Sequence, residues 1–482
     1  MSVETDLLTE MLAVLPGVDA DGLSLQATGG LPSAFPVSEL ATAAVSAAAL
    51  AAARIVGSPD IPGSAHVPGS LHVPGSPRVT VDRQLASAWF GTTLEPIGWE
   101  LPSVWDAIAG DYRSSDGWIR LHTNAPHHRA AALSVLGVDA DRDAVASVVE
   151  TWRGADLEAA VVSAGGCAAV MNSPEDWVAS EPGIAVSQQP LIAWADLSTG
   201  RADAWGGGHP HPVDHPLAGV RVLDLTRVLA GPVATRFLAL LGADVLRVDP
   251  PGWDEGVIPD VNLGKRTTRL NLHIPGDRRT FSELVHGADV VVHGYRPGAL
   301  DKLGFGADER QRLRPGLIDI SLDAYGWSGP LAERRGFDSL VQMSSGIAHT
   351  GMTWSGADTP VPLPVQALDH ATGYLMAAAT LSALAHRRQS SVGRSARLSL
   401  ARTAQLLLER PGEGDHTPFI GRAPEHPDTT QPDTEQPDTE QPDTEQTTWG
   451  PARRLRPPFA IDGVSLEASP ARALGLDRPV WR

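Results

Sequence analysis

Asp369 is the residue whose type and position most clearly suggest chemistry. It lies in the sequence Leu-Asp-His-Ala-Thr-Gly (368–373), after an apolar stretch and at the start of a helix of small residues predicted over 365–387. A carboxylate in the first turn of a helix is stabilised by the helix dipole and by free amide groups, which would be a capping role. A carboxylate can also attack an acyl group and form a mixed anhydride, and small neighbours would leave space for a thioester. The residues alone leave both roles open.

Basic side chains recur after the predicted strands and form a second candidate site. In a chain of net charge −19, cations gathered near strand ends are a reasonable site for phosphate groups. The alternative is a solvated surface, which is the usual position of Lys and Arg. The residues concerned are Arg247, Lys265, Arg266, Arg296 and Lys302.

The element that would position these groups is a βαβ unit at 216–252. Two short aliphatic runs, 220–225 and 244–249, flank a helical pattern at 232–241, which predicts parallel strands. The turn after the first strand, 227–232, lies where ligands bind in open α/β sheets. It has no GxGxxG motif, so a dinucleotide site of the usual kind, and with it an NAD-dependent oxidoreductase, is disfavoured.

Further strands and helices are predicted on both sides of this unit. Strands follow at 289–293 and 317–322, and helices at 277–287 and 306–313. Before the unit, residues 78–205 indicate a mixed α/β segment. Its predicted strands are 79–82, 118–122 and 167–171, its predicted helices are 127–137, 141–153 and 157–164, and Ser173 starts another helix.

The N-terminal region contains a helix that echoes the one after Asp369. A first helix is predicted up to residue 15, before Pro16-Gly17, and a second over 37–55 with Ser38 as its N-cap. The second helix resembles 365–388 in its small residues, and each is followed by a spacer and a strand-like segment, 78–87 and 396–405. This pattern indicates a duplication in which Asp369 falls opposite Ala41.

Three stretches have a loop or linker composition. The HVPGS repeat at 57–77 predicts an exposed loop, and the repeat explains its His66 and His72 better than metal binding does. Residues 206–215, which begin with three glycines, predict a linker. The acidic, Pro- and Thr-rich repeats of 421–446 have no apolar residues to bury and predict disorder.

Length and composition limit the function classes. The 482 residues suffice for two or three domains, and 42% hydrophobic residues predict a mainly globular chain. The negative net charge argues against nucleic acid as a partner. The single cysteine, Cys167, fits a reducing compartment. The N-terminus lacks a basic n-region, and the Ala-rich run 41–53 is too short to span a bilayer, so a cytoplasmic protein without a membrane partner is expected.

Residues 216–405 resemble the family III CoA-transferases, the CaiB/BaiF group that includes formyl-CoA transferase, carnitine CoA-transferase and the bile-acid-inducible CoA-transferases. The resemblance rests on five ordered motifs: PLAGVRVLDLTRVLAGPVATRFLALLGADVLRVDPPG, NLGKRTTRLNL, ADVVVHGYRPGALDKLGFG, AYGWSGPLAERRGFDSLVQMSSG and LDHATG. It implies an α/β fold with a Rossmann-like, parallel-sheet CoA-binding domain and a smaller α/β domain. It also implies a homodimer of interlocked chains.

The resemblance implies roles for individual residues. Asp369 and Gly373 match the family's D-x-x-x-G segment, whose aspartate attacks the acyl-CoA thioester and passes through aspartyl anhydride and aspartyl-CoA states. Asp338 matches an acidic position that lies in the active site of some members. CoA enters as part of the substrate, and no metal or redox cofactor is implied. The residues that match positions lining the CoA pocket are Val228, Arg247, Lys265, Arg266, Tyr295, Lys302 and Arg335.

The chain also departs from the family pattern. Tyr295 stands in a pocket motif, Gly-Tyr-Arg-Pro-Gly (294–298), that usually carries an Asn. Phe337 stands where racemases of the superfamily carry a histidine, so racemase activity is disfavoured. Material like the family's small domain precedes the CoA-binding domain, which indicates a rearranged or tandem-derived member. The predicted division is 1–75 helical with a repeat loop, 76–205 small α/β domain, 206–215 linker, 216–410 CoA-binding domain, 411–449 disordered and 450–482 tail.

The function expected from these observations is CoA transfer from an acyl-CoA thioester to a carboxylic acid. A catalytically inactive CoA-binding relative is the alternative, because the pocket motif is altered. An oxidoreductase with a Rossmann-type domain is the least favoured of the three.

Overall fold

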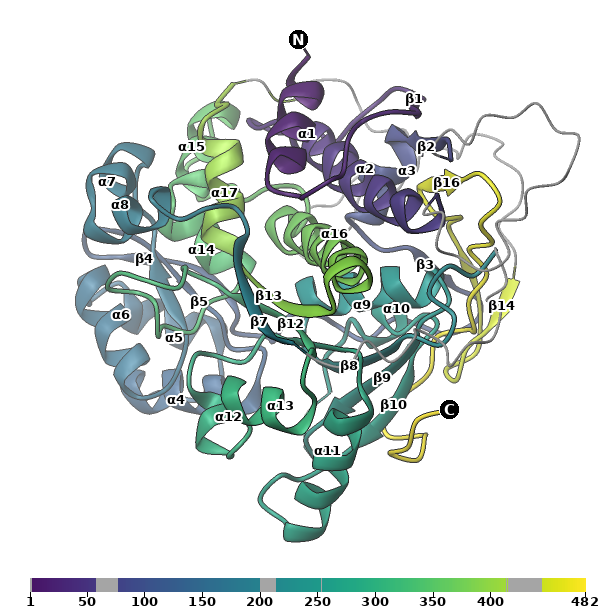
Figure 1. Ribbon diagram of the computed structural model, residues 1–482. Coiled ribbons are helices and arrows are strands. Elements are labelled where there is room, and N and C mark those ends of the chain that lie inside the picture. The colour runs from purple at the N-terminus through teal and green to yellow at the C-terminus, as the bar shows by residue number, and fades with distance from the viewer. Residues whose placement is uncertain (1, 58–76, 200–213, 253, 413, 415–443) are drawn as a thin grey trace, which may run out of the picture.

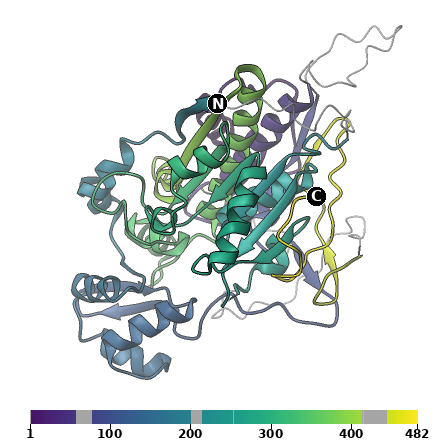
Figure 2. The same cartoon turned by 60° about the horizontal axis from the view of Figure 1, so that its bottom comes forward.

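The computed structural model describes residues 2–57, 77–199, 214–252, 254–412, 414 and 444–482 (Figure 1). A central twisted sheet is covered by helices, and a smaller α/β unit forms a lobe at one side (Figure 2). The predicted α/β class is confirmed. His66, His72, residues 206–213 and most of the acidic repeat lie outside the described residues.

The central sheet has seven strands in the order β10-β9-β8-β11-β12-β13-β7. All neighbouring pairs are parallel except β13 with β7, so the predicted parallel sheet carries one antiparallel edge strand. The chain runs from β8 outward to β9 and β10 and then returns to start β11 beside β8, and such a reversal marks the ligand crevice of open sheets. The strands are β7 (Ala193–Thr199), β8 (Arg221–Leu225), β9 (Asp244–Asp249), β10 (Arg266–Arg269), β11 (Val290–His293), β12 (Ile318–Asp323) and β13 (Val392–Ser399).

Because side chains alternate between the two faces of the central sheet, the core to which each side chain belongs shows which helices cover which face. Val222 of β8 belongs to the core that includes helices α9 (Ala230–Leu240) and α16 (Ala367–Ser390), whereas Leu223 belongs to the core under α11 (Pro275–Gly287). Successive side chains of a strand point to opposite faces, so this near-continuous aliphatic strand is buried on both. Short helices α10 (Ile258–Val261), α12 (Ala299–Lys302) and α13 (Ala307–Leu313) complete the connections.

The N-terminal segment packs on the α16 face of the sheet. It contains α1 (Val3–Ala13), β1 (Leu23–Gln26), α2 (Val37–Val56), β2 (Val79–Asp82) and α3 (Arg83–Trp89). Helix α2 is long and apolar enough to cross a membrane by length and composition alone, but most of its residues are buried here, and it packs along α16. The N-cap of α2 is Pro36 and not Ser38, because the Ser38 hydroxyl accepts a hydrogen bond from the Leu31 amide at 2.8 Å.

The two echoing helices begin with the same backbone geometry. Pro36 has φ −75° and ψ 66°, and Gln366 has φ −75° and ψ 65°. In both, the first helical amide donates to the carbonyl two residues earlier, at 2.8 Å in α2 and 2.7 Å in α16. Superposing the two N-caps places Glu39 opposite Asp369, which corrects the expected pairing with Ala41.

The duplication continues beyond the helices. β2 pairs in parallel with β1, as β13 does with β12, and each strand ends in a residue whose side chain caps the next helix. Asp82 caps α3 and Ser399 caps α17 (Leu400–Leu408). The predicted strand-like segments 78–87 and 396–405 are therefore strand–helix junctions, because the capping side chain starts a helix halfway through each.

The smaller unit is built on a three-stranded antiparallel sheet, β4 (Gly110–Ser114), β5 (Gly117–Leu121) and β6 (Ala168–Val170). Helices α4 (Pro126–Leu136), α5 (Arg142–Val149) and α6 (Gly154–Ser163) cover it, and α7 (Pro174–Ala179) and α8 (Glu181–Ser187) follow. It has its own apolar core and packs on α14 (Asp338–Ser344) and α15 (Ile347–Ser355) through Cys167 and Ala169.

Strand pairing crosses the predicted domain boundaries. β3 (Leu94–Pro96) pairs with β15 (Pro451–Arg454), and β16 (Phe459–Ile461) pairs with β2. β14 (Thr444–Gln446) pairs with β15, so the last residues of the repeat expected to be disordered instead form a strand with a partner. The C-terminal segment thus joins the N-terminal segment to the edge of the main body (Figure 1).

Candidate active site

The turn between β8 and α9 is strained and closely packed. Val228 adopts φ +65°, a left-handed conformation that is costly for a β-branched residue. A Cβ added to Gly231 would lie 2.3 Å from a Thr226 methyl carbon, so only glycine fits there. Strain of this kind is kept where the surrounding structure fixes it, and here it presents the first amide groups of α9 at the carboxyl edge of the sheet.

Asp369 lies against this turn because α16 approaches α9 very closely. A Cβ at Gly373 would lie 2.5 Å from the Ala230 carbonyl oxygen and 2.9 Å from the Val233 Cβ. The glycine one turn after Asp369 is therefore a packing requirement. The resulting approach brings the Ala230 N–H near the Asp369 carboxylate, where it acts to lower the pKa of that group.

Asp338 is the second carboxylate of the site. It is the first residue of α14, fully buried, and its Oδ2 accepts the backbone N–H of Asp369 at 2.9 Å. It also accepts the Leu368 N–H, and the Gln342 side-chain amide binds its other oxygen. No side chain within α16 caps the start of that helix, so Asp338 supplies the cap from a neighbouring helix.

Burial and proximity raise the pKa values of both carboxyl groups. Burial raises the pKa of Asp338 to about 6, against its hydrogen bonds with Gln342 and two amides. Burial and then the neighbouring Asp338 raise the pKa of Asp369 well above its ordinary value, and only the Ala230 N–H acts in the other direction. Two like charges close together disfavour each other's ionisation, which is why Asp338 acts to raise the pKa of Asp369.

Three of the predicted CoA-binding cations are used inside the protein. Lys265 is 0% exposed, with Nζ 3.1 Å from Asp224 Oδ2 and 2.8 Å from the Pro232 carbonyl, and burial lowers its pKa to about 8. It positions the β8–α9 turn and cannot meet a phosphate in this conformation. Arg247 is likewise 0% exposed and pairs with Asp249 and Glu255, at 2.9 and 3.2 Å.

Arg266 is directed away from the site. Its guanidinium binds both oxygens of Asp244, at 2.9 and 3.0 Å, and Asp244 starts β9 at the amino end of the sheet. Sequence spacing could not distinguish these three cations from ligand-binding ones. Arg247 lies within β9 and Arg266 within β10, and the partner that each side chain meets depends on the folded sheet.

The other predicted pocket residues lie nearer the carboxyl edge. Val228 forms the strained turn, and Tyr295 follows β11, where burial raises its pKa to about 12 and Asp249 and Arg227 are close. Lys302 ends α12 and is exposed. Arg335 precedes α14 and donates to the Gly165 carbonyl at 2.7 Å, so it joins the main body to the smaller unit. Direct contact of these four with CoA stays a prediction.

Residues of the smaller unit also reach the site. The His122 ring stacks on Phe337, the neighbour of Asp338, with ring centroids 3.7 Å apart. Arg120, two residues earlier on the same strand, lowers the pKa of Asp338 by its charge. The signal that could have revealed them is the sequence Arg-Leu-His, since alternate residues of a strand share a face. The sequence analysis interpreted this segment only as part of the small domain.

Arg227 is a further residue that the sequence analysis did not single out. Its Nε donates to Glu255 Oε1 at 2.6 Å, and Glu255 also binds Arg247. This network joins the turn that faces Asp369 to the loop after β9. The carboxyl edge of the sheet is therefore held by paired charges.

Comparison with known proteins shows which part of the chain resembles a known family. Residues 217–431 match the family model described as CoA-transferase family III. An acetyl-coenzyme A transferase of Hypoxylon pulicicidum is 36% identical over 233 residues, which are 46% of this chain and 39% of that protein. A "probable fatty acyl-CoA transferase" of Mycobacterium tuberculosis is 36% identical over 192 residues, 37% of this chain and 48% of that protein. The chain spans about half the length, or less, of these curated relatives.

The matches to solved structures cover a similar share of this chain. A crystal structure of the Mycobacterium tuberculosis protein is 36% identical, with a TM-score of 0.36, covering 39% of this chain and 54% of that one. A CaiB/BaiF family protein from Brucella suis is 29% identical, with a TM-score of 0.36 and the same coverage.

Proposed function

Because residues 217–431 match the model of CoA-transferase family III, we propose that the protein moves CoA from an acyl-CoA thioester to a carboxylic acid. The observation that carries the proposal is the placement of Asp369. A carboxylate of raised pKa lies in the first turn of α16, beside the Ala230 N–H at the carboxyl edge of a parallel sheet. Relatives of this chain include a succinyl-CoA:glutarate CoA-transferase of Mus musculus and a formyl-CoA:oxalate CoA-transferase of Escherichia coli.

The proposed reaction uses Asp369 as a nucleophile. Its ionised carboxylate attacks the thioester carbonyl, the carbon–sulfur bond breaks, and CoA leaves as thiolate while an aspartyl anhydride forms. The thiolate attacks the aspartyl carbonyl, which releases the first acid and leaves aspartyl-CoA. The second acid attacks the carbonyl of this thioester, the carbon–sulfur bond breaks, and an anhydride of Asp369 with the second acid forms as CoA thiolate leaves. The thiolate then attacks the new acyl carbonyl, which gives the new acyl-CoA and restores the Asp369 carboxylate. No net proton is consumed.

The protein's own groups support this sequence in two ways. The Ala230 N–H lies close enough to the Asp369 carboxylate to lower its pKa, so it would favour the ionised form. The raised pKa makes the ionised carboxylate a stronger nucleophile, but lowers the fraction that is ionised at a given pH. Asp338 contributes to that raised pKa and also holds the helix start, so we assign it a positioning role.

Mass spectrometry tests the proposal directly. The protein is incubated with acyl-CoA and quenched with hydroxylamine, which should convert the activated Asp369 to a hydroxamate. Asp369→Ala should lose CoA transfer and the modification while retaining CoA binding by calorimetry. Binding without modification or transfer, for every acyl-CoA and acid tried, would instead support the inactive CoA-binding relative.

Assembly and location belong to the same proposal. The resemblance favours a homodimer, and composition favours the cytoplasm. Light scattering tests the first, since a mass near 50.8 kDa would show a single chain. A single chain is a real alternative because α2 of the same molecule covers α16.

A further inference from the structure

Gln342 is a fully buried amide on the same face of α14 as Asp338, one helical turn later. Its side-chain oxygen, Oε1, accepts the backbone N–H of Leu363 at 2.7 Å, and its nitrogen, Nε2, donates to Asp338 Oδ1. Leu363 belongs to the segment that leads into α16. The Gln342 side chain therefore joins this segment to the carboxylate that caps α16.

The partners of Gln342 fix the orientation of its amide. A backbone N–H can only donate, so the atom that faces Leu363 must be the amide oxygen. The amide nitrogen then faces Asp338 and can only donate, so Asp338 Oδ1 must accept. The opposite orientation would set a donor against a donor and an acceptor against an acceptor. Gln342 thus recognises Asp338 as an acceptor.

The Leu363 amide that anchors Gln342 is itself held in place. Leu363 is buried, and two residues earlier the Val361 N–H donates to the Ala348 carbonyl of α15 at 3.2 Å. A Cβ added to Gly351 would lie 2.2 Å from the Val361 carbonyl oxygen, so the segment lies directly on α15. The Oε1 end of Gln342 therefore has a fixed partner.

Asp338 contacts only hydrogen-bond donors within the described part of the chain. Its Oδ1 receives the Gln342 amide, and its Oδ2 receives the Asp369 N–H at 2.9 Å. The Leu368 N–H also acts on this carboxylate and lowers its pKa. Because each oxygen is engaged by a different donor, the carboxylate cannot turn about its Cβ–Cγ bond without leaving a buried polar group unpaired, which is costly.

We propose that Gln342 is a positioning residue of the site: by binding Asp338 Oδ1, it keeps Oδ2 on the first amides of α16 and so keeps Asp369 in place. This role rests on the proposed function and adds a residue to its site. Gln342 acts through Asp338 and not on the substrate. Without its donor, the carboxylate could turn away, and the first turn of α16, which has no cap from its own side chains, would open.

Gln342→Met tests the role because methionine keeps the length of the side chain and removes its amide. Transfer is measured with acetyl-CoA and succinyl-CoA as donors and with oxalate and glutarate as acceptors. The variant should lose at least about tenfold in kcat while KM for the acyl-CoA stays within about threefold, because Asp369 is misplaced and CoA binding is not. Hydrogen exchange of residues 367–370, measured by mass spectrometry, should be at least about tenfold faster than in the wild type.

A second substitution shows whether Gln342 acts through Asp338. Asp338→Ala removes the carboxylate, so adding Gln342→Met to it should change neither kcat nor the exchange of 367–370 by more than about twofold. A merely structural role of Gln342, in packing or in holding Leu363, would give losses that add.

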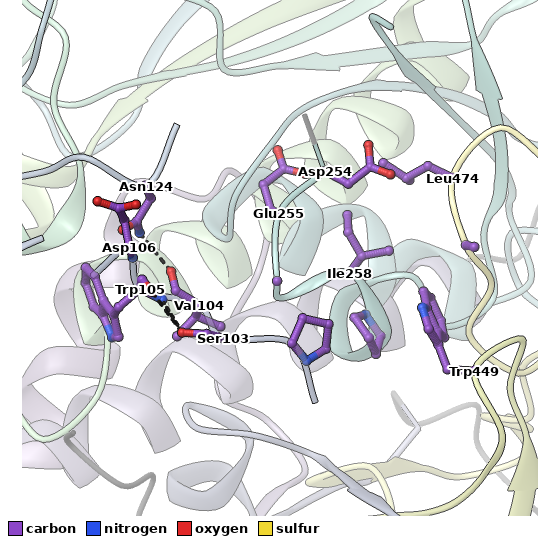
Figure 3. A pocket seen from close by; sticks show the side chains of 14 residues that line it. Ser103, Val104, Trp105, Asp106, Asn124, Asp254, Glu255, Ile258, Trp449 and Leu474 are labelled. Atoms are coloured by element: carbon purple, nitrogen blue, oxygen red, sulfur yellow. Dashed lines mark hydrogen bonds between the residues drawn. The ribbon is translucent and has the colours of Figure 1, made fainter. Parts of the chain in front are cut away.

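Asn124→Leu is the matched control, since it also replaces an amide by an apolar side chain of similar size. The Asn124 amide lies in the wall of a cavity of about 280 Å³, which none of Asp338, Gln342 and Asp369 lines (Figure 3). Its Oδ1 accepts the Asp106 N–H at 3.0 Å, and its Nδ2 donates to the Val104 carbonyl at 2.9 Å. Kcat and the exchange of 367–370 should stay within about twofold of the wild type.

The adverse outcomes are distinct. Wild-type exchange of 367–370 in Gln342→Met would overturn the proposed role, and so would faster exchange with an unchanged kcat. Additive losses with Asp338→Ala, or equal losses in Asn124→Leu, would also overturn it. Absence of transfer by the wild type with every pair would count against the proposed function instead. Hydrogen exchange would then still decide whether Gln342 holds Asp338 on the start of α16.

Discussion

The chain contains two similar helix–strand–helix units whose first helices carry an acidic side chain at the equivalent position in different surroundings. The α16–β13–α17 unit starts with Asp369 beside the Ala230 N–H and Asp338. The α2–β2–α3 unit starts with the same cap geometry, but Glu39 at the equivalent position pairs with Arg83 at 2.7 Å. Arg83 also binds the Gly29 carbonyl, at 2.9 Å, so the cation is fixed in place.

The surroundings of the two carboxylates differ. In α16 the acid faces an amide and another acid, which leaves its charge without a cationic partner and raises its pKa. In α2 an arginine neutralises the acid. The residue of α2 that corresponds to Gly373 is Ala43, so the glycine that permits close approach of another helix is absent there. Under the proposed function, the acid of α16 would react, whereas the equivalent acid of α2 forms an ion pair.

The largest predicted effect is a difference in CoA transfer between variants of Asp369 and of Glu39. Asp369→Asn should lower CoA transfer by at least about 10³-fold, because the amide cannot form the anhydride. Glu39→Gln should leave kcat within about twofold, because the ion-pair partner of Glu39 is Arg83 in the N-terminal segment. Transfer rates from acyl-CoA, measured by chromatography, give both values. Equal losses in two folded variants would show that the N-terminal copy takes part in catalysis.

The second prediction tests the close helix approach. Gly373→Ala adds a Cβ 2.5 Å from the Ala230 carbonyl, so α16 must move and carry Asp369 away from its amide partner. A displacement of about 1 Å can cost 10²-fold in rate, and overpacking costs about 1–3 kcal/mol in the free energy of unfolding.

The matched change in the other copy is Ala43→Gly. It should cost up to about 1 kcal/mol from helix propensity and leave the rate unchanged. Rates together with urea unfolding separate the two effects. A Gly373→Ala protein with normal kcat would refute the packing explanation of the D-x-x-x-G segment.

The third prediction concerns pH. Asp338→Asn retains a hydrogen-bond acceptor for the helix start but removes the like charge, so the pKa of Asp369 should fall. The rising limb of the kcat–pH profile should move to lower pH. If the profile keeps its position while kcat falls, Asp338 has a structural role only.

The same substitution has a stability consequence with a defined sign. The pKa of Asp338 is raised on folding from about 3.9 to about 6, so its favourable contribution is complete below pH 3.9 and is lost as the pH rises through 6. At pH 8 the wild type therefore bears a penalty of up to about 3 kcal/mol that Asp338→Asn lacks. Urea unfolding at pH 8 and pH 4 should show the variant gaining stability only at the higher pH.

Strand runs, caps and motifs made much of the fold predictable from sequence. The βαβ unit, the parallel sheet and most helices of the smaller unit follow from aliphatic runs and helical periodicity, which report local burial. The position of Asp369 on α16 was predictable for the same reason. The functions of Lys265 and Arg247 were not, since their carboxylate partners Asp224 and Glu255 lie 41 and 8 residues away and meet them only in the folded sheet.

The pairings between distant segments could not be predicted either. Nothing in the local sequence tells that β2 pairs with β16, 380 residues later, or that His122 stacks on Phe337. The registers of short strands depend on tertiary packing. The equivalence of Asp369 with Glu39 was missed because small-residue helices align almost equally well in several registers, and the shared cap geometry was needed to choose one.

The smallest predicted effect concerns the contribution of the Glu39–Arg83 ion pair to the free energy of unfolding. Glu39 and Arg83 are 16% and 15% exposed, so their pairing lies between a surface and a buried ion pair. A double-mutant cycle with Glu39→Gln and Arg83→Gln should give a coupling of about 1 kcal/mol in the free energy of unfolding, and all three variants should retain full kcat. A coupling near zero would mean that Arg83 is held mainly by Gly29 and other contacts. Hydroxamate formation at Glu39 in Arg83→Gln would show something different, namely that neutralisation by Arg83 alone keeps this carboxylate from reacting.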